Sequence, residues 1–511
     1  MDTIAPQIGG EKVYLWLLMA VGLVVAGFLG VLIGTDAVTT VIVIAATGGS
    51  LAWLIVARQR WWLLMPVAAT LGGFFYFGFK IYPHEIALLG CAVPLLLSRT
   101  LSGRGSLDRH RSSFPLAMHL LSVYLFAHWL GSMAYNRLNG EGGYGNVTRA
   151  YFNALWVILF VFAFRRYGSS KYLPAALLLT YLSAFARVIT TVGIYLSKSF
   201  AYIPVINYVL PGSTQSGIGD LRWSGLALGT VAICYFLLKR NFLSRLFHGA
   251  VFLGSFAAVL FGSGRTALVL ICLAPISAAL IYRKALPVLF AILAAGGLIL
   301  AINAFPTVLN DMPFMVQRST SILLLNPDQA DKYGEATSSD EWHADLRKVG
   351  LAKWTKDWNS FVFGTGIRPF DSAMYDQIPG KTTWEDLLSS SSKVGAYESG
   401  WWTVVAVTGL VGIVSYLSVL IYLLRRLLPV LLRDKVRDHR RAFAFLAVLN
   451  IIIWLGLGWT NGGFPSTEIM FGFLALIALQ DERAERPRPL APIPVRHIPS
   501  SGQRRTLQRA R

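Results

Sequence analysis

The chain has 511 residues, of which 55% are hydrophobic and 14% are charged, and its formal net charge is +20 at pH 7. This small number of charged side chains cannot cover the surface of a soluble domain. The composition therefore excludes a soluble globular protein and indicates an integral membrane protein. A large positive charge is also typical of nucleic-acid-binding proteins, but the positions of the charges along the chain argue against that class.

Apolar runs, each enough to cross about 30 Å of hydrocarbon as a helix, recur along most of the chain. We predict an all-α polytopic membrane protein with about 14 transmembrane helices. The runs at 84–98, 150–164 and 466–480 are short enough to be tilted or re-entrant, so 12 or 13 spans are an alternative. The first run lacks the features of a cleaved signal peptide. The predicted spans are 14–34, 37–57, 61–79, 84–98, 115–135, 150–164, 173–196, 223–238, 246–263, 266–282, 285–303, 400–424, 442–459 and 466–480.

Basic residues cluster in every second gap between these runs. This alternation is the positive-inside bias, which predicts that both termini lie in the cytoplasm. The net charge therefore reflects membrane topology, and we expect no nucleic-acid partner. The clusters are Arg58 and Arg60; Arg99, Arg104, Arg109 and Arg111; Arg165, Arg166 and Lys171; Lys239, Arg240 and Arg245; Arg283 and Lys284; the segment 425–441; and the tail from Arg483 to Arg511.

One gap on the opposite side, residues 304–398, is much longer than the others. Before Glu398 it holds nine Lys or Arg and twelve Asp or Glu. Its tryptophans and phenylalanines favour a packed cap over a loose linker, so we predict a periplasmic cap that carries specificity. The expected organisation is helices 1–11 in 1–303, the cap in 304–398, helices 12–14 in 399–480 and a disordered cytoplasmic tail in 481–511 that touches membrane lipid.

Metal and disulfide chemistry are not indicated. The three cysteines, Cys91, Cys234 and Cys272, all lie in apolar runs, and no metal-ligand spacing is present. His343 stands among acidic residues of the cap, so a metal site with Asp340, Glu341 or Asp345 is a weaker alternative.

Arginines at membrane depth or at its outer edge are the first candidates for function, because a charge in hydrocarbon is costly and is retained for a reason. Arg187, in LSAFARVITTVGIYL, lies well inside a span, where it either reaches a substrate or pairs with a neighbouring helix. Arg222, in GDLRWSGLALG, opens a helix on the outer side. The alternative for Arg222 is an interfacial anchor beside Trp223.

Arg265 ends the short turn GSGR between two predicted spans. Exposed backbone N–H groups, the positive end of the following helix and a guanidinium together suit a phosphate group; an arginine that only marks a helix end is the alternative. Arg347 lies in the cap, in EWHADLRKVG, seventeen residues before Gly364. The glycines of GTGIRPF, Gly364 and Gly366, allow a tight turn and a close approach to a neighbour.

Taken in order, these landmarks resemble the O-antigen ligase and polymerase superfamily. They are Arg222 in RWSGL, Arg265 in GSGRTAL, Arg347 before FGTGIRPF, and Glu398 eleven residues before Gly409 in VTGLVG. The resemblance covers about residues 220–420, and the rest of the chain is similar only in its hydropathy. The motifs are short, and it is their order and spacing that identify the family.

The resemblance implies a GT-C-like glycosyltransferase that uses glycans carried on undecaprenyl pyrophosphate, with no metal and no cofactor. It implies that Arg265 and Arg347, with Arg222, stabilise the departing pyrophosphate, and that Glu398 accepts the proton of the attacking sugar hydroxyl. The family's ligases carry a histidine at the position of Glu398. Since the family's polymerases vary there, a carboxylate favours a polymerase, and its reaction is expected to invert the anomeric centre.

The expected protein is thus a repeat-unit polymerase of the bacterial inner membrane whose site faces the periplasm. Arg187, Gly364, Gly366 and Tyr397 are expected to contact substrate, although Tyr397 also fits an interfacial aromatic belt, and Glu398 fits an exposed helix N-terminus. Expected partners are the chain-length regulator and flippase of the same pathway. The alternatives are a ligase that transfers polymer to lipid A core or another acceptor, a lipid-linked oligosaccharide flippase, and a structural partner of a synthesis complex.

Overall fold

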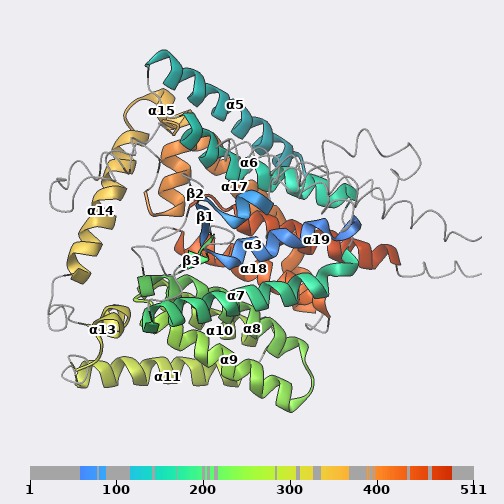
Figure 1. Ribbon diagram of the computed structural model, residues 1–511, viewed down its shortest axis with the longest axis vertical. Coiled ribbons are helices and arrows are strands. Elements are labelled where there is room, and N and C mark those ends of the chain that lie inside the picture. The colour runs from blue at the N-terminus through green and yellow to red at the C-terminus, as the bar shows by residue number, and fades with distance from the viewer. Residues whose placement is uncertain are drawn as a thin grey trace, which may run out of the picture.

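The structure is a computed structural model, and it is mostly helical (Figure 1). The first two predicted spans, most of the span at 84–98 and the tail beyond Glu485 lie outside the described residues. The residues that the structure describes are 58–76, 80–87, 115–140, 144–167, 170–197, 202–203, 208–211, 217–281, 283, 285–305, 311–325, 335–367, 388, 391, 395, 397–433, 438–458 and 463–485.

Ten predicted spans, from 115–135 to 466–480, coincide with long helices. Six of the described helices are long and apolar enough to cross a membrane, and α10 and α19 are shorter apolar helices. Helices satisfy their own backbone hydrogen bonds, which is what an apolar run in lipid requires. The helices are α5 (Leu116–Leu138), α6 (Tyr144–Tyr167), α7 (Leu173–Ser197), α8 (Leu221–Leu238), α9 (Phe242–Phe261), α10 (Arg265–Ile281), α11 (Ala285–Ala304), α17 (Gly400–Arg433), α18 (His439–Leu457) and α19 (Ser466–Glu485).

The predicted span at 61–79 is wrong as a continuous helix. The chain forms a 3-10 turn, η1 (Arg58–Leu63), and the short helix α3 (Leu64–Leu71), and then leaves the helical path. Gly72 and Gly73 both have positive φ, at 68° and 67°, a conformation that hydropathy does not register. The strands that follow, β1 (Phe74–Tyr76) and β2 (Lys80–Ile81), join β3 (Tyr202–Ile203) and β4 (Tyr208–Val209) in a small antiparallel sheet of order β2-β1-β4-β3.

Small residues allow α8, α9 and α10 to pack closely. A Cβ added at Gly225 would lie 2.8 Å from the carbonyl oxygen of Ser255 on α9. One added at Gly229 would lie 2.8 Å from Cδ1 of Ile271 on α10. Close approach of this kind is how helices associate in lipid, where apolar burial gives no advantage. The arrangement fixes the N-terminus of α8 beside the turn between α9 and α10.

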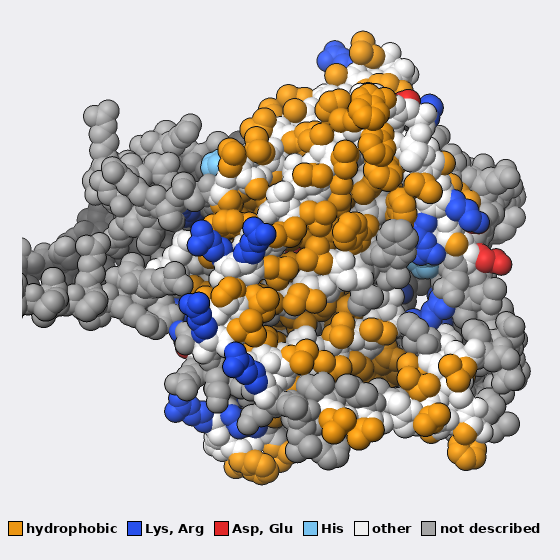
Figure 2. Space-filling view, turned by 180° about the vertical axis from the view of Figure 1, so that it is seen from behind, with side chains coloured by type: hydrophobic (Ala, Val, Ile, Leu, Met, Phe, Trp, Pro, Cys, Tyr) orange, Lys and Arg blue, Asp and Glu red, His pale blue; other side chains and the backbone are white. Residues whose placement is uncertain are grey.

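One face of the molecule is broadly apolar, and its charges collect at the edges. Figure 2 shows hydrophobic side chains across this face and a row of Lys and Arg along one edge. At the opposite edge, further Lys or Arg side chains lie round a hollow. An apolar band bordered by charge is the pattern expected for a membrane protein.

The segment that the sequence predicts as a cap includes η6 (Ser321–Leu323) and the helices α13 (Phe314–Thr320), α14 (Glu335–Trp354) and α15 (Trp358–Phe363). These helices lie at one end of the bundle (Figure 1). Ser319 on α13 donates a hydrogen bond from Oγ to the carbonyl oxygen of Leu260, 2.7 Å away, at the end of α9. The predicted cap therefore docks at the end of the bundle that carries the GSGR turn.

Helix α17 is interrupted at Gly409, where φ is 65° and ψ is −165°. The glycine turn after α15 fills the interruption: the amide N–H of Thr365 donates to the carbonyl of Ala406, and that of Gly366 to the carbonyl of Val407. Gly364 itself has φ 81°, and a Cβ there would overlap the backbone of Val407. The close approach expected of GTGIRPF is therefore an approach to the backbone of α17.

We predict that Gly364→Ala destabilises the protein by about 2 kcal/mol or more, because the side chain both strains a left-handed residue and collides with a backbone oxygen. Thermal unfolding of the purified protein measures the change. Gly131→Ala on α5 is the matched control, since nothing lies within 4 Å of its Cβ position. Equal melting temperatures for the two variants would contradict the role of this contact.

Candidate functional site

The GSGR turn, Gly262 to Arg265, packs directly against the start of α8. A Cβ added at Gly264 would lie 2.7 Å from Cβ and 3.3 Å from Cδ of Arg222, and one at Gly262 would overlap the backbone of Arg222. Arg265 is the first residue of α10. One arginine singled out in the sequence, Arg222, therefore packs against the turn that ends in another, Arg265, and the glycines are what permit that contact.

Two polar atoms at this turn are buried without a hydrogen-bond partner: Nε of Arg222 and Oγ of Ser263. Ser263 is 8% exposed and has φ 58°, which is uncommon for a residue with a side chain. A buried donor without a partner is unfavourable, so such atoms mark positions where a ligand can supply the missing contact. An anionic oxygen is a suitable partner for each of these donors.

The charges that act on Arg222 come from three different segments. They are Arg318 on α13, Glu398 just before α17, and Asp220 just before α8. Arg318 was not singled out in the sequence, because nothing local to α13 indicates that it approaches α8. Basic groups of α8, α10 and α13 therefore gather at one end of the bundle with Glu398 in their field. Such a group can bind a di-anionic phosphate.

Glu398 has a left-handed backbone, with φ 51°. Its neighbours are fixed: Tyr397 is 1% exposed, and Ser399 is 2% exposed and donates from Oγ to the carbonyl of Gly458, 2.9 Å away. The Glu398 side chain is 51% exposed, with Oε2 lying 3.5 Å from Nδ1 of His343 on α14. A positive φ at a residue with a side chain is strained and persists only where the surrounding structure enforces it. At Glu398 this conformation directs the carboxylate outward between two buried residues.

Arg347 follows His343 by one helical turn, so the two side chains lie on the same face of α14. Arg347 is half-buried and makes no hydrogen bond or ion pair with another described residue. We expect its guanidinium to reach a ligand bound near the His343–Glu398 pair. Arg347 lies on α14 and Arg222 on α8, so a ligand that both bind must reach from the turn to α14.

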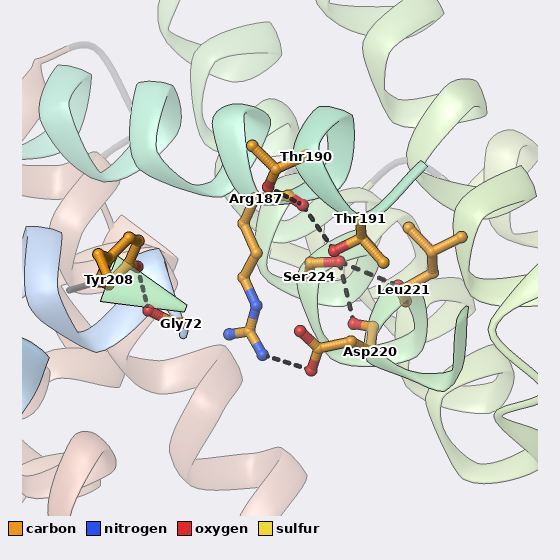
Figure 3. A network of polar contacts seen from close by, with 8 residues as sticks. All are labelled: Gly72, Arg187, Thr190, Thr191, Tyr208, Asp220, Leu221 and Ser224. Atoms are coloured by element: carbon orange, nitrogen blue, oxygen red, sulfur yellow. Dashed lines mark hydrogen bonds and ion pairs between the residues drawn. The ribbon is translucent and has the colours of Figure 1, made fainter. Parts of the chain in front are cut away.

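Arg187 has a protein partner. Its Nη2 donates to Oδ1 of Asp220, 2.8 Å away, and both side chains are 17% exposed (Figure 3). A Cβ at Gly72 would lie 2.6 Å from Nε of Arg187, so the arginine is pressed against the turn that precedes β1. Tyr208 donates to the carbonyl of Gly72, and burial raises the pKa of Tyr208 to about 12. Of the two sequence alternatives for Arg187, pairing with a neighbouring element is the one these contacts favour; contact with substrate stays a prediction.

We expect Asp220→Asn to lower the free energy of unfolding by about 1 to 2 kcal/mol, because Arg187 then keeps its charge in a largely buried place without a counter-ion. Chemical or thermal unfolding measures it. Lys348→Ala is the control: that lysine pairs with Asp345 at 3.0 Å, but its side chain is 77% exposed. Its loss is expected to change stability by less than about 0.5 kcal/mol. A similar loss in both variants would argue against a buried pair at Arg187.

Gly364, Gly366 and Tyr397 are all placed by packing. A Cβ at Gly366 would lie 2.6 Å from Oγ of Ser132 on α5, and one at Gly350 would lie 3.1 Å from the ring of Tyr397. Burial raises the pKa of the Tyr397 hydroxyl, which therefore stays neutral. The structure gives these residues roles in holding the predicted cap to the bundle, and their contact with substrate stays a prediction.

Sequence reasoning missed Ser263, Arg318 and the pairing of His343 with Glu398. Ser263 was visible inside the GSGR turn, but the direction of its side chain depends on the positive φ. His343 was weighed as a metal ligand. Among the described residues no group of three His, Cys, Asp or Glu could hold a metal ion.

No protein-family model matches the chain, and no curated protein matches its sequence. The described fold defines an α-helical membrane protein, by the length and composition of its helices.

Proposed function

We propose that the protein is a membrane glycosyltransferase that joins lipid-pyrophosphate-linked oligosaccharide repeat units on the outer face of the bacterial cytoplasmic membrane. The observation that supports this most is the arrangement at the GSGR turn: Arg222 of α8 packs against the turn that ends in Arg265 of α10, with two buried donors lacking partners and a carboxylate in the field of Arg222. Departure of a pyrophosphate needs charge stabilisation of this kind at the edge of the bilayer.

In the proposed reaction, Arg222, Arg265 and Ser263 bind the pyrophosphate of the growing chain. Glu398 accepts the proton from the terminal hydroxyl of an incoming repeat unit, whose oxygen attacks the anomeric carbon from the face opposite the leaving group. The new glycosidic bond forms as the bond to the phosphate oxygen breaks, and the lipid pyrophosphate leaves with the electron pair. The configuration inverts. Planar guanidinium groups suit this task because they bind two phosphate oxygens at once.

Topology agrees with an outward-facing site. Helix α8 ends at Leu238 before Lys239 and Arg240, and α10 ends at Ile281 before Arg283, so the basic ends are opposite the GSGR turn. By the positive-inside bias those ends face the cytoplasm and the turn faces out. A ligase that uses a different acceptor would need the same donor site, so it remains the alternative within this chemistry.

The glycans that accumulate in cells lacking the protein distinguish these functions. A polymerase defect leaves lipid-linked single repeat units on the outer face of the membrane. A ligase defect leaves long polymer on the lipid carrier, and a flippase defect leaves single units on the cytoplasmic face. Mass spectrometry of extracted lipids, with a membrane-impermeant label for the outer face, separates the three outcomes; the last would overturn the proposal.

A further inference from the structure

A stripe of polar side chains on α5 binds the segment that the sequence assigns to the cap. Tyr124, His128, Ser132 and Asn136 follow one another at intervals of four residues, so they lie along one side of the helix. Nε2 of His128 donates to the carbonyl oxygen of Phe363 at 2.7 Å, and Nδ2 of Asn136 donates to that of Ile367 at 3.3 Å. The segment 363–367 therefore runs alongside α5.

A hydrogen-bond chain fixes the His128 ring. Because Nε2 donates to a carbonyl, Nδ1 accepts, and the Tyr151 hydroxyl supplies that proton at 2.6 Å. Tyr151 in turn accepts from Oγ of Ser132 at 3.0 Å. The single hydroxyl proton of Tyr124 is shared between the carbonyls of Thr408 and Phe363. Groups of α5 and the interruption in α17 thus bind the carbonyls of Phe363 and Ile367 and the amide N–H groups of Thr365 and Gly366.

These contacts lie within the length of a helix that could cross a membrane. His128 lies about 15 Å along α5 from the end at Leu138, since a helix rises about 1.5 Å per residue. α5 is one of the helices long and apolar enough to cross a membrane. Irregular backbone is tolerated at that depth only when protein groups take up its hydrogen bonds. Here the carbonyls of Phe363 and Ile367 and the amide N–H groups of Thr365 and Gly366 have such partners.

Helix α15, which leads into this segment, exposes large aromatic side chains. Trp358 is 77% exposed and Phe363 is 49% exposed. Phe361 lies between the rings of Trp358 and Trp354, at centroid distances of 5.8 and 4.9 Å, and Nε1 of Trp354 donates to the carbonyl of Phe361. Rings displayed this way would be unfavourable in water, while tryptophan is enriched where a protein meets the lipid headgroups.

Helix α5, which binds the segment, also has an exposed apolar face. The outward face of α5 carries Val123, Phe126 and Leu130, at 69%, 51% and 47% exposure, on the side away from the polar stripe. Lys353 and Lys356 stand next to the tryptophans, and lysines beside aromatic rings are typical of a segment lying in the headgroup region.

We propose that α15 and the glycine turn form a re-entrant element of the outer leaflet, with Trp358 in the headgroup region and Phe363 against acyl chains. The partner of this surface is the lipid bilayer. The cap is thereby attached to the membrane at a second place, besides the ends of the helices that flank it in the sequence. This inference does not depend on the proposed chemistry.

Spin labels test the depth. In a full-length protein with Cys91, Cys234 and Cys272 replaced by Ala, single cysteines are introduced as Trp358→Cys and Phe363→Cys. Leu130→Cys is the lipid-facing reference and Lys348→Cys the aqueous reference. After reconstitution into phosphatidylglycerol–phosphatidylethanolamine vesicles, collisions with oxygen and with a water-soluble nickel chelate are compared. The oxygen-to-nickel ratio at Phe363 is expected to match that at Leu130, several-fold above Lys348, with Trp358 between them.

Ratios at both positions equal to that at Lys348 would overturn the proposal. A second measurement uses the unsubstituted protein, so it does not depend on how the variants fold. Lipids with a photoreactive group on the acyl chain are activated in the same vesicles, and the tryptic peptide that begins at Asp357 is analysed. Label within 358–363 and none on the peptide ending at Arg347 supports the inference; label on neither peptide contradicts it.

Discussion

Replacing Glu398 by Gln is expected to stop chain extension and to leave lipid-linked single repeat units on the outer face of the membrane. Glutamine keeps the size and shape of the side chain but cannot accept a proton. Loss of a positioned general base reduces a rate by about 10²- to 10⁴-fold. Because Tyr397 and Ser399 hold the backbone on both sides of Glu398, the variant is expected to keep its fold.

The measurement is polymer length on gels together with mass spectrometry of the lipid-linked glycans, in cells whose only copy carries the variant. Glu341→Gln is the matched control, since that acid lies exposed on α14 near His343 and no role is assigned to it. Normal polymer from Glu398→Gln would show that Glu398 is not the base. Loss of polymer in both variants would point to a general effect of negative charge near His343.

The helical part of the fold was predictable because an apolar run in lipid has few alternatives. The run at 115–135 became α5 (Leu116–Leu138) and the run at 285–303 became α11 (Ala285–Ala304). Hydropathy depends on composition and not on φ. The span predicted at 61–79 therefore continued across Gly72 and Gly73, where the helix ends. It also gave no warning of the sheet, whose strands β1 and β4 lie far apart in the sequence.

The glycine turn shows a different limit. Gly364 and Gly366 indicated a tight turn and a close approach, and both features are present, but what they approach is set by α5 and α17. A signal was available: Tyr124, His128, Ser132 and Asn136 recur every four residues within an apolar run, and polar groups so placed need partners. Reading that stripe against the cap would have indicated that part of the cap enters the bundle.

For the candidate site, local sequence patterns identified the arginines but not which residues they lie beside. The glycines around Ser263 correctly indicated a short turn between two helices, but not that Arg222 packs against it. The approach of Arg318 and the pairing of His343 with Glu398 join segments separated by whole helices. Such contacts follow from helix packing, so no local spacing could have predicted them.

Lysine at Arg222 or at Arg265 is expected to lower turnover by on the order of 10²-fold although the charge is kept, because an ammonium cannot bind two phosphate oxygens in one plane. A second reason for the expected loss applies at Arg222, because its Nε is buried without a protein partner and lysine has no equivalent atom. Arg137→Lys, at the exposed end of α5, is the control and is expected to leave turnover unchanged.

The double variant, Arg222→Lys with Arg265→Lys, makes the test specific to the turn. If both guanidinium groups bind one pyrophosphate across Gly262–Gly264, the second substitution removes less than the first, and the combined loss is smaller than the product of the two single losses. Two independent contributions would multiply instead. Turnover of lipid-linked repeat units by the reconstituted protein measures all four forms. Wild-type turnover in both single variants would rule out a pyrophosphate site at this turn, and multiplied losses would place the two arginines on separate ligands.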